Sequence, residues 1–418
     1  MPFEHRLFTA ALGLESPWSV GDVRFDATAG RIDFAIAFPA GTRFCCPACG
    51  AVNQPVHDTR ERSWRHLHFF QYQAFIHARV PRVRCRECSK TTQVAVAWAR
   101  AGSGFTQLFE ALVVTLCGAM PVNTVAGRLG VSDDAIWRIL DYYVEAARAQ
   151  ADYSDVRRVG VDETAARRGQ RYITLFHDFG QGRLLFACDG RDQHTVARFA
   201  EDLRAHGGAP EQVDAVCMDM SKAYISGVSK HLSTAAITFD AFHVIQLANR
   251  AVEEVRRAES KHQPALKHSR WTWLKDKRKW TQRQISQAHD LTRRRLKTAR
   301  AWRLKESLRD LYRQANSPEQ AHALFAKWYN WARRCRLEPI KRLATTLKSH
   351  LQGLLNAFDS GLSNGRVEGI NSLIQAAKAR ARGYRTTGSL TTIAYLIAGK
   401  LVHLPTSPYA RVKPESAS

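Results

Sequence analysis

The chain has 418 residues and a formal net charge of +24, with 62 Lys and Arg against 38 Asp and Glu. At about 100–200 residues per domain, this length indicates several domains, and the 45% hydrophobic and 24% charged residues exclude a disordered or collagen-like chain. The basic excess predicts a polyanionic partner, since Lys and Arg displace counterions from phosphates; an anionic membrane surface is the alternative. No segment has the ~20 apolar residues of a membrane span, and the N-terminus has no signal-peptide pattern, so we expect a cytoplasmic protein.

Two C-x-x-C pairs stand in the N-terminal region, and an alternating run over 64–79 between them predicts strands or a hairpin that brings them together. Four thiolates suit the tetrahedral geometry of zinc. We therefore expect one structural Zn²⁺ in a zinc-binding domain over 1–104, held by Cys46, Cys49, Cys85 and Cys88. Unrelated reduced cysteines or a redox motif are the alternative, and the rival ligands are His57, His66, His68 and His77.

Residues 105–152 change to helical periodicity, with helices expected at 106–119, 122–129 and 133–149. The small Ala126 allows two helices to approach, and Gly130 allows the tight turn of a helix-turn-helix. The DNA contacts expected here are Asn123, Thr124, Ser132, Trp137 and Arg138. A helical hairpin without DNA contact is the alternative, because two acidic residues open the last helix.

Residues 153–249 alternate strands and helices. Strands are expected at 158–162, 171–179, 183–188, 213–219 and 235–239, and helices at 193–206, 221–230 and from 241 onward. Three strands, helix, strand, helix, strand, helix is the order of a ribonuclease-H-like α/β domain.

Two carboxylates end apolar strands in this region, Asp162 and Asp219. An acid at the carboxyl end of a strand projects into the crevice where α/β sheets bind ligands. Two such acids on adjacent strands predict a Mg²⁺ site, and Glu368 is the best candidate for a third ligand. Turn or cap residues are the alternative for each acid.

Residues 250–350 look helical and hold 27 Lys and Arg against 9 Asp and Glu, a net charge of +18, with tryptophans interleaved. We expect a basic helical insertion domain here, and the catalytic domain to resume over 351–405 with helices at 364–379 and 389–402. The tail over 406–418 is expected to be disordered.

Four motifs resemble bacterial insertion-sequence transposases of the ISL3 family. They are Val159-Gly-Val-Asp162-Glu-Thr164, Cys217-Met-Asp219-Met-Ser-Lys-Ala-Tyr224, Phe239-Asp240-Ala-Phe-His243 and Asn364-Gly-Arg-Val-Glu368-Gly-Ile-Asn371. The resemblance implies that Asp162, Asp219 and Glu368 form a DDE catalytic triad that holds two Mg²⁺ (or Mn²⁺) ions on a ribonuclease-H-like fold. It also implies an auxiliary role for Asp240 and His243; a helix cap and a first-turn residue are the alternative. Further DNA contacts are expected from Arg366, Lys222, Lys378, Arg380 and Arg382.

The expected function is therefore that of a DNA transposase. The zinc and helix-turn-helix modules would bind the terminal inverted repeats of an insertion sequence, and the triad would cleave and transfer DNA strands. Partners would be double-stranded DNA and a second copy of the chain, as a homodimer or higher oligomer, in the bacterial cytoplasm at the nucleoid and without a membrane. A catalytically inactive DNA-binding regulator and a ribonuclease-H-like nuclease acting on RNA or hybrids are the alternatives.

Overall fold

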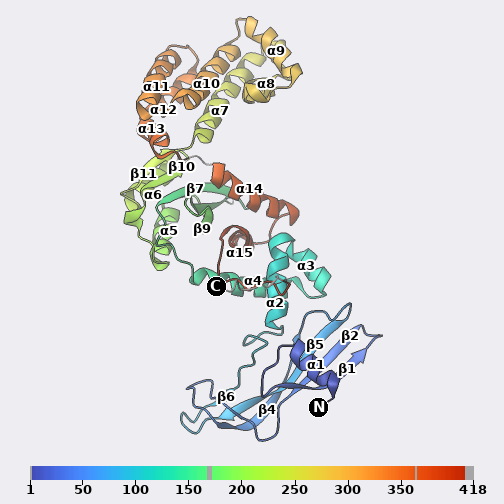
Figure 1. Ribbon diagram of the computed structural model, residues 1–418. Coiled ribbons are helices and arrows are strands. Elements are labelled where there is room, and N and C mark those ends of the chain that lie inside the picture. The colour runs from blue at the N-terminus through green and yellow to red at the C-terminus, as the bar shows by residue number, and fades with distance from the viewer. Residues whose placement is uncertain (1, 167–171, 363–364, 410–418) are drawn as a thin grey trace, which may run out of the picture. The chain divides into compact units, whose positions relative to one another are not determined.

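The structure is a computed structural model that describes residues 2–166, 172–362 and 365–409. It divides into two compact units, residues 1–146 with 403–418 and residues 147–402 (Figure 1). Most of the tail expected to be disordered, residues 410–418, lies outside the described residues. None of the described helices is both long and apolar enough to cross a membrane.

The first unit contains a six-stranded sheet of order β1-β2-β5-β4-β3, with β6 beside β5. The strands are β1 (Ser19–Asp26), β2 (Arg31–Ala37), β3 (Arg43–Phe44), β4 (Gln54–Arg65), β5 (Gln73–Arg84) and β6 (Thr91–Gln93). The expected pairing within 64–79 is confirmed, because β4 and β5 are antiparallel with Ser63 opposite His77. One face of the sheet is closed by tryptophans: Trp98 contacts Trp18 at 5.2 Å and Trp64 at 5.6 Å between ring centroids.

Sequence reasoning missed the helix that precedes this sheet, α1 (Phe3–Ala11). The helix has nine residues, buries none of them and has no side-chain N-cap, so neither periodicity nor a capping residue marks it.

Three helices follow the sheet, as expected: α2 (Gln107–Ala119), α3 (Val122–Leu129) and α4 (Asp133–Ala149). Gly130 ends α3 with a φ of 67°, the left-handed conformation that glycine adopts at little cost. The Ser132 hydroxyl accepts a hydrogen bond from the amide of Ala135 at 3.2 Å, so it caps α4. The inner face is apolar, with Val125, Ala126 and Ile136 buried.

The second unit is built on a five-stranded sheet of order β11-β10-β7-β8-β9. Its strands are β7 (Arg158–Ala165), β8 (Tyr172–Asp178), β9 (Arg183–Asp189), β10 (Ala215–Met218) and β11 (Ala236–Phe239). β7, β8 and β9 are antiparallel neighbours, whereas β10 is parallel to both β7 and β11. The five strands expected from the sequence are therefore present, in the expected chain order.

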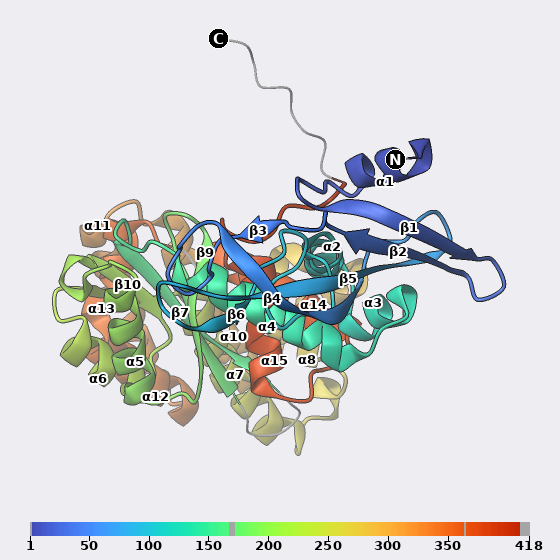
Figure 2. The same cartoon turned by 90° about the horizontal axis from the view of Figure 1, so that it is seen from below.

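Helices cover both faces of this sheet. On one face lie α5 (Gln193–Ala205) and α6 (Lys222–His231), side by side in Figure 1 and Figure 2, and Phe199 of α5 stacks on Phe176 of β8 at 4.3 Å between centroids. On the other face lie α14 (Gly365–Arg380) and α15 (Thr387–Ala398). The amide of Ala187 in β9 donates a hydrogen bond to the Tyr395 hydroxyl of α15 at 2.9 Å.

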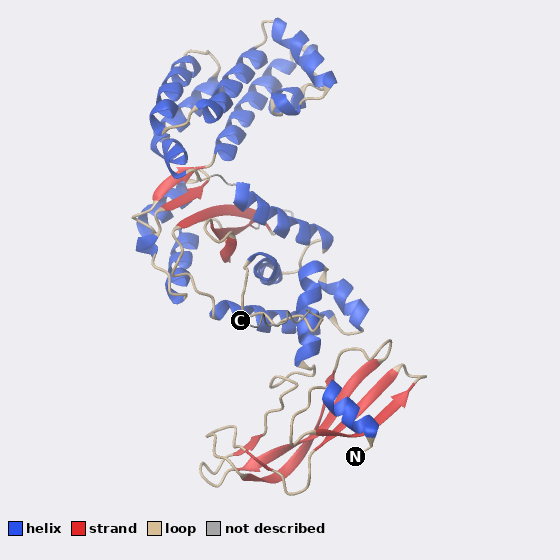
Figure 3. Cartoon of the chain, viewed as in Figure 1, coloured by secondary structure: helices blue, strands red, loops and turns tan. Residues whose placement is uncertain are grey.

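Residues 241–360 form an all-helical region between β11 and α14, and Figure 3 shows no strand in it. Its helices are α7 (Ala241–Ser260), α8 (Arg270–Leu274), α9 (Gln282–Arg293), α10 (Lys297–Gln314), α11 (Pro318–Arg333), α12 (Glu338–Ser349) and α13 (Leu351–Ser360), with single 3₁₀ turns at Pro264–Leu266 and Lys277–Lys279. Another 3₁₀ turn, Pro210–Gln212, precedes β10. Trp273 and Trp328 are buried in the core of this region, whereas Trp271 and Trp331 are exposed.

Candidate functional site

Three aspartates lie in one row across the parallel strands of the second unit. Cys217 of β10 pairs with Gly160 of β7, so continuing this register by two residues sets Asp219 beside Asp162. Met218 pairs with Phe239 of β11, so the next residues, Asp219 and Asp240, are also neighbours. Adjacent strands are about 4.8 Å apart, and side chains at equivalent positions of parallel strands share a face. We call Asp162, Asp219 and Asp240 the carboxylate row.

Helix α14 runs over β7 with one face turned to the strand. The Asn371 amide donates a short hydrogen bond to the Asp162 carboxylate, the Gln375 amide donates to the Thr164 hydroxyl, and the Lys378 ammonium donates to the Ala165 carbonyl. Glu368 lies one turn before Asn371 on the same helix face. Glu368 therefore belongs to the face of α14 that is turned to β7.

The electrostatics of the site agree with this placement. Burial raises the pKa of Asp162, an effect opposed by the hydrogen bond from the Glu163 amide, by His243 and by Asn371, while the charge of Asp219 adds to it. Partial burial also raises the pKa of Glu368, with further contributions from the charges of Asp240 and Asp162 and an opposing one from His243. The acids thus repel one another while His243 attenuates the repulsion.

The acids form an open site. In the part of the chain that the structure describes, one group of three or more potential metal ligands has all its donor atoms within 4.8 Å of one another. This group consists of four cysteines, which are described below. Asp162, Asp219 and Glu368 do not form such a group, and Glu368 is exposed to solvent.

Glu163 lies on the opposite face of β7 and is held by a buried tyrosine. The Tyr224 hydroxyl of α6 donates to the Glu163 carboxylate at 3.0 Å and is 2.8 Å from the Thr174 hydroxyl. Burial raises the pKa of Glu163, and the Tyr224 hydrogen bond opposes this effect. The sequence does not reveal this network, because it depends on which helix packs over the sheet.

A basic pocket of about 790 Å³ lies at the C-terminal end of α14. Its lining includes Lys378, Arg382, Tyr384 and Arg385. Arg380, also expected to contact DNA, is exposed on the same helix, and Lys222 is exposed at the start of α6. Arg366 belongs to α14, but its side chain lies outside the described residues.

The four cysteines form a compact cluster in the first unit. The Sγ atoms of Cys46 and Cys88 are 3.8 Å apart, and those of Cys49 and Cys85 are 3.6 Å apart. A tetrahedron with Zn–S bonds of about 2.3 Å has edges of about 3.8 Å, so the four sulfurs fit a zinc ion. The amides of Glu87 and Cys88 also donate to the Cys85 sulfur, at 3.4 and 3.5 Å.

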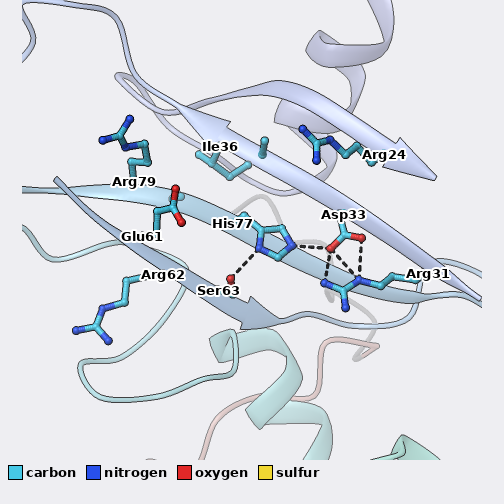
Figure 4. Close-up of a pocket in the computed structure, with 11 residues that line it drawn as sticks. Arg24, Arg31, Asp33, Ile36, Glu61, Arg62, Ser63, His77 and Arg79 are labelled. Atoms are coloured by element: carbon cyan, nitrogen blue, oxygen red, sulfur yellow. Dashed lines mark hydrogen bonds and ion pairs between the residues drawn. The ribbon is translucent and has the colours of Figure 1, made fainter. Parts of the chain in front are cut away.

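The rival histidines lie elsewhere. His77 stands between the Ser63 hydroxyl, 2.7 Å from Nδ1, and the Asp33 carboxylate, 2.5 Å from Nε2, in an open pocket on the sheet (Figure 4). His66 Nδ1 is 2.9 Å from the Thr106 hydroxyl, and burial lowers the pKa of His66 to about 4. Of the remaining cysteines, Cys45 is exposed, and the buried thiols are Cys117, Cys188, Cys217 and Cys335.

The residues expected to contact DNA through the helix-turn-helix lie on its surface. Asn123 and Thr124 are exposed near the start of α3, and Ser132 and Arg138 are exposed at the start of α4. Trp137, the residue before Arg138 in the sequence, is half-buried. This surface is the one through which such modules enter a DNA groove.

Comparison of the sequence with known protein families assigns three segments of the chain. Residues 159–394, more than half of the chain, match a transposase family, the DDE transposases of ISL3 type. The chain belongs to the ISL3 family of transposases. Residues 94–144 of this transposase match the helix-turn-helix domain of transposase family ISL3, and residues 42–88 match the zinc-finger of the transposases of IS204, IS1001, IS1096 and IS1165.

Curated relatives cover nearly the whole transposase. It is 29% identical to the transposase for insertion sequence element IS1557 of Mycobacterium tuberculosis, over 96% of this chain and 97% of the relative. It is 27% identical to the transposase for insertion sequence element IS1001 of Bordetella parapertussis, over 91% of this chain and 95% of the relative. The protein is thus a DDE transposase, an enzyme of DNA cleavage and transposition, that contains DNA-binding modules and a structural zinc site.

Proposed function

We propose that Asp162, Asp219 and Glu368 are the catalytic triad of this transposase and hold two Mg²⁺ or Mn²⁺ ions. The observation that carries the proposal is the carboxylate row together with Glu368 on the facing side of α14. Strands that are neighbours in the sheet bring together two acids that are 57 residues apart in the sequence, and α14 adds a third from 149 residues further on.

The residues fit such ions by their chemistry. Mg²⁺ prefers carboxylate oxygens and keeps room for water and substrate phosphates, which agrees with an open group of acids. Burial and, to a smaller extent, the neighbouring acids raise the pKa values of Asp162 and Glu368, and a bound cation would stabilise their charged forms. When bound, the ions would lower the pKa of an attacking water or 3′-hydroxyl and stabilise the leaving oxygen.

The other residues of the site would position the acids and the DNA. Asn371 fixes the orientation of the Asp162 carboxylate, and His243 supplies positive character beside Asp162 and Glu368 when it is protonated. We assign Asp240 and His243 auxiliary roles at the row. Phosphates next to the cleaved bond would lie along the basic pocket, where Lys378 and Arg382 would contact them. Further phosphate contacts would come from Arg380, Arg366 and Lys222.

We also propose that the five-stranded sheet is a ribonuclease-H-like core interrupted by an insertion. From one edge of the sheet to the other the strands are β9, β8, β7, β10 and β11, so the third, second, first, fourth and fifth strands of the chain lie side by side. The first three are antiparallel neighbours. This arrangement supports a ribonuclease-H-like core. The proposed domains are zinc-binding 1–104, helix-turn-helix 105–152, catalytic 153–249 with 351–405, helical insertion 250–350 and a disordered tail 406–418.

The first unit would bind the terminal inverted repeats. Cys46, Cys49, Cys85 and Cys88 would hold the zinc, and the helix-turn-helix would contact DNA through Asn123, Thr124, Ser132, Trp137 and Arg138. Two ends must be cut for one transposition, so we propose a homodimer or higher oligomer on double-stranded DNA at the nucleoid.

Metal binding tests the triad independently of catalysis. Titration calorimetry of the full chain with Mn²⁺, in the presence of inverted-repeat DNA from the flanks of the gene, should give two sites per chain. Asp162→Asn and Asp219→Asn should each lower the Mn²⁺ affinity at least tenfold, whereas Asp189→Asn, at the end of another strand of the sheet, should leave it unchanged. Equal affinity in all variants would contradict the assignment and would favour a DNA-binding protein without a catalytic metal site.

A further inference from the structure

The helical region carries a concentrated positive patch at one end. Residues 267–300, which we call the basic tip, hold 12 Lys and Arg against 2 Asp and Glu, a net charge of +10. All twelve cations are exposed. The segment contains α8, α9 and the start of α10, which lie at the end of the helical region away from β10 and β11 (Figure 1).

Most of these cations are available for a partner. Eight have no ion pair or side-chain hydrogen bond to any residue that the structure describes: Lys267, Lys275, Lys279, Arg283, Arg293, Arg294, Arg295 and Lys297. Of the two acids within the tip, Asp276 pairs with Arg278 at 3.0 Å and with Arg313 at 2.9 Å, and Asp290 is exposed. The tip is therefore not neutralised by its own chain.

Two basic segments of the tip come together around α10. Trp280, which follows Lys277–Lys279, stacks on Trp302 of α10 at 5.5 Å between centroids. The other segment, residues 293–297, leads directly into α10, and Lys297 is five residues before Trp302, about 8 Å along a helix axis. The two basic segments thus both lie close to the N-terminal half of α10.

The tip lies at a distance from the carboxylate row that suits a single DNA duplex. α7 begins directly after Asp240, and α8 returns to its distal half, where Arg270 lies 3.6 Å from Glu253. Glu253 is 13 residues along from Asp240, about 20 Å of helix, which corresponds to about six base pairs at 3.4 Å each.

We propose that the basic tip binds the backbone of target DNA about six or more base pairs from the site of strand transfer. Contacts from Lys and Arg to phosphates carry no sequence information. Such a surface suits DNA that is bound without regard to its sequence, as we propose for the target, whereas we propose that the helix-turn-helix binds the inverted repeats. This inference rests on the proposed catalytic function.

The test compares two triple variants of the full chain with the same change of charge. R293Q/R294Q/R295Q removes three cations at the C-terminal end of α9, and K327Q/R333Q/R334Q removes three exposed cations from α11 and its C-terminal cap. Each protein is first loaded with inverted-repeat DNA and then titrated with a second, random-sequence duplex.

The tip variant should capture the random duplex at least tenfold more weakly at 0.1 M salt and still bind the inverted repeat within about twofold of wild type. The slope of log affinity against log salt concentration should fall by up to about 2.7, from roughly 0.9 per phosphate contact. Unchanged capture, an equal loss in the α11 variant, or an equal loss of inverted-repeat binding would each overturn the proposal. If instead the wild type neither cleaves the ends nor binds Mn²⁺, the proposed function fails.

Discussion

Gly353 provides a stability test whose sign follows from the structure. This residue of α13 packs against β11: a Cβ atom built on it would lie 2.4 Å from Cε2 and 2.5 Å from Cδ2 of Phe239. The Phe239 ring is 3% exposed and also contacts the His350 ring at 5.4 Å between centroids, so it has little room to move. Gly353→Ala therefore forces the ring, and the strand end that carries Asp240, out of place.

The expected magnitude combines two opposing effects. Replacing glycine by alanine within a helix stabilises by about 1 kcal/mol, whereas overpacking a closed core costs about 1–3 kcal/mol. The net of these two effects predicts that Gly353→Ala lowers the free energy of unfolding by about 1 kcal/mol, and by no more than about 2 kcal/mol. Gly369→Ala in α14 is the matched control, because its Cβ would meet no atom within 4 Å, and it should raise the free energy of unfolding.

The assay is urea unfolding combined with hydrogen–deuterium exchange of peptides from α13 and β11. Gly353→Ala should lower the urea midpoint and speed exchange in both peptides, and cleavage of transposon ends should fall because Asp240 directly follows Phe239. A midpoint that rises to the same extent as in Gly369→Ala would refute the close packing of α13 on β11.

Three other predictions concern single contacts. Tyr224→Phe removes a hydrogen bond to the Glu163 carboxylate and should lower the free energy of unfolding by about 2 kcal/mol. Tyr153→Phe is the control, because its equally buried hydroxyl donates to a backbone carbonyl, and it should cost about 1 kcal/mol. Equal losses for the two variants in urea unfolding would contradict a charged partner for Tyr224. Burial lowers the pKa of Lys305 to about 8, below its value in the unfolded chain. Between these two pKa values the unfolded state binds more protons than the folded state, so the free energy of unfolding increases with pH. The difference in unfolding free energy between wild type and Lys305→Met should therefore rise by about 2 kcal/mol from pH 7 to pH 9.5. A difference that does not change with pH would show that the lysine is solvated. Elemental analysis should find one zinc per chain, and Cys85→Ser should lose both the metal and inverted-repeat binding; full zinc occupancy in that variant would contradict the four-cysteine site.

Much of the fold could be predicted because local patterns determined it. The apolar runs of β7 to β11 and the glycine turn of the helix-turn-helix gave element boundaries within a few residues. The short strands β3 and β6, with two and three residues, and α1 with its exposed surface lack such patterns. Their formation depends on pairing and packing with distant segments.

The site could be predicted only in part for the same reason. Strand-end acids and C-x-x-C pairs are visible in the sequence. The contacts that Asn371, Gln375 and Lys378 make with β7 are not, because they require knowing that α14 packs on this strand from more than 200 residues away. The sequence likewise does not show that Asp240 lies beside Asp219, because this depends on the register between β10 and β11.

The most direct test of the central claim is end cleavage by single carboxylate variants. With Mg²⁺ and inverted-repeat DNA, we predict that Asp219→Asn and Glu368→Gln abolish detectable cleavage while binding the DNA within about twofold of wild type, and that Asp189→Asn cleaves normally. Cleavage at the wild-type rate by either triad variant would contradict the account.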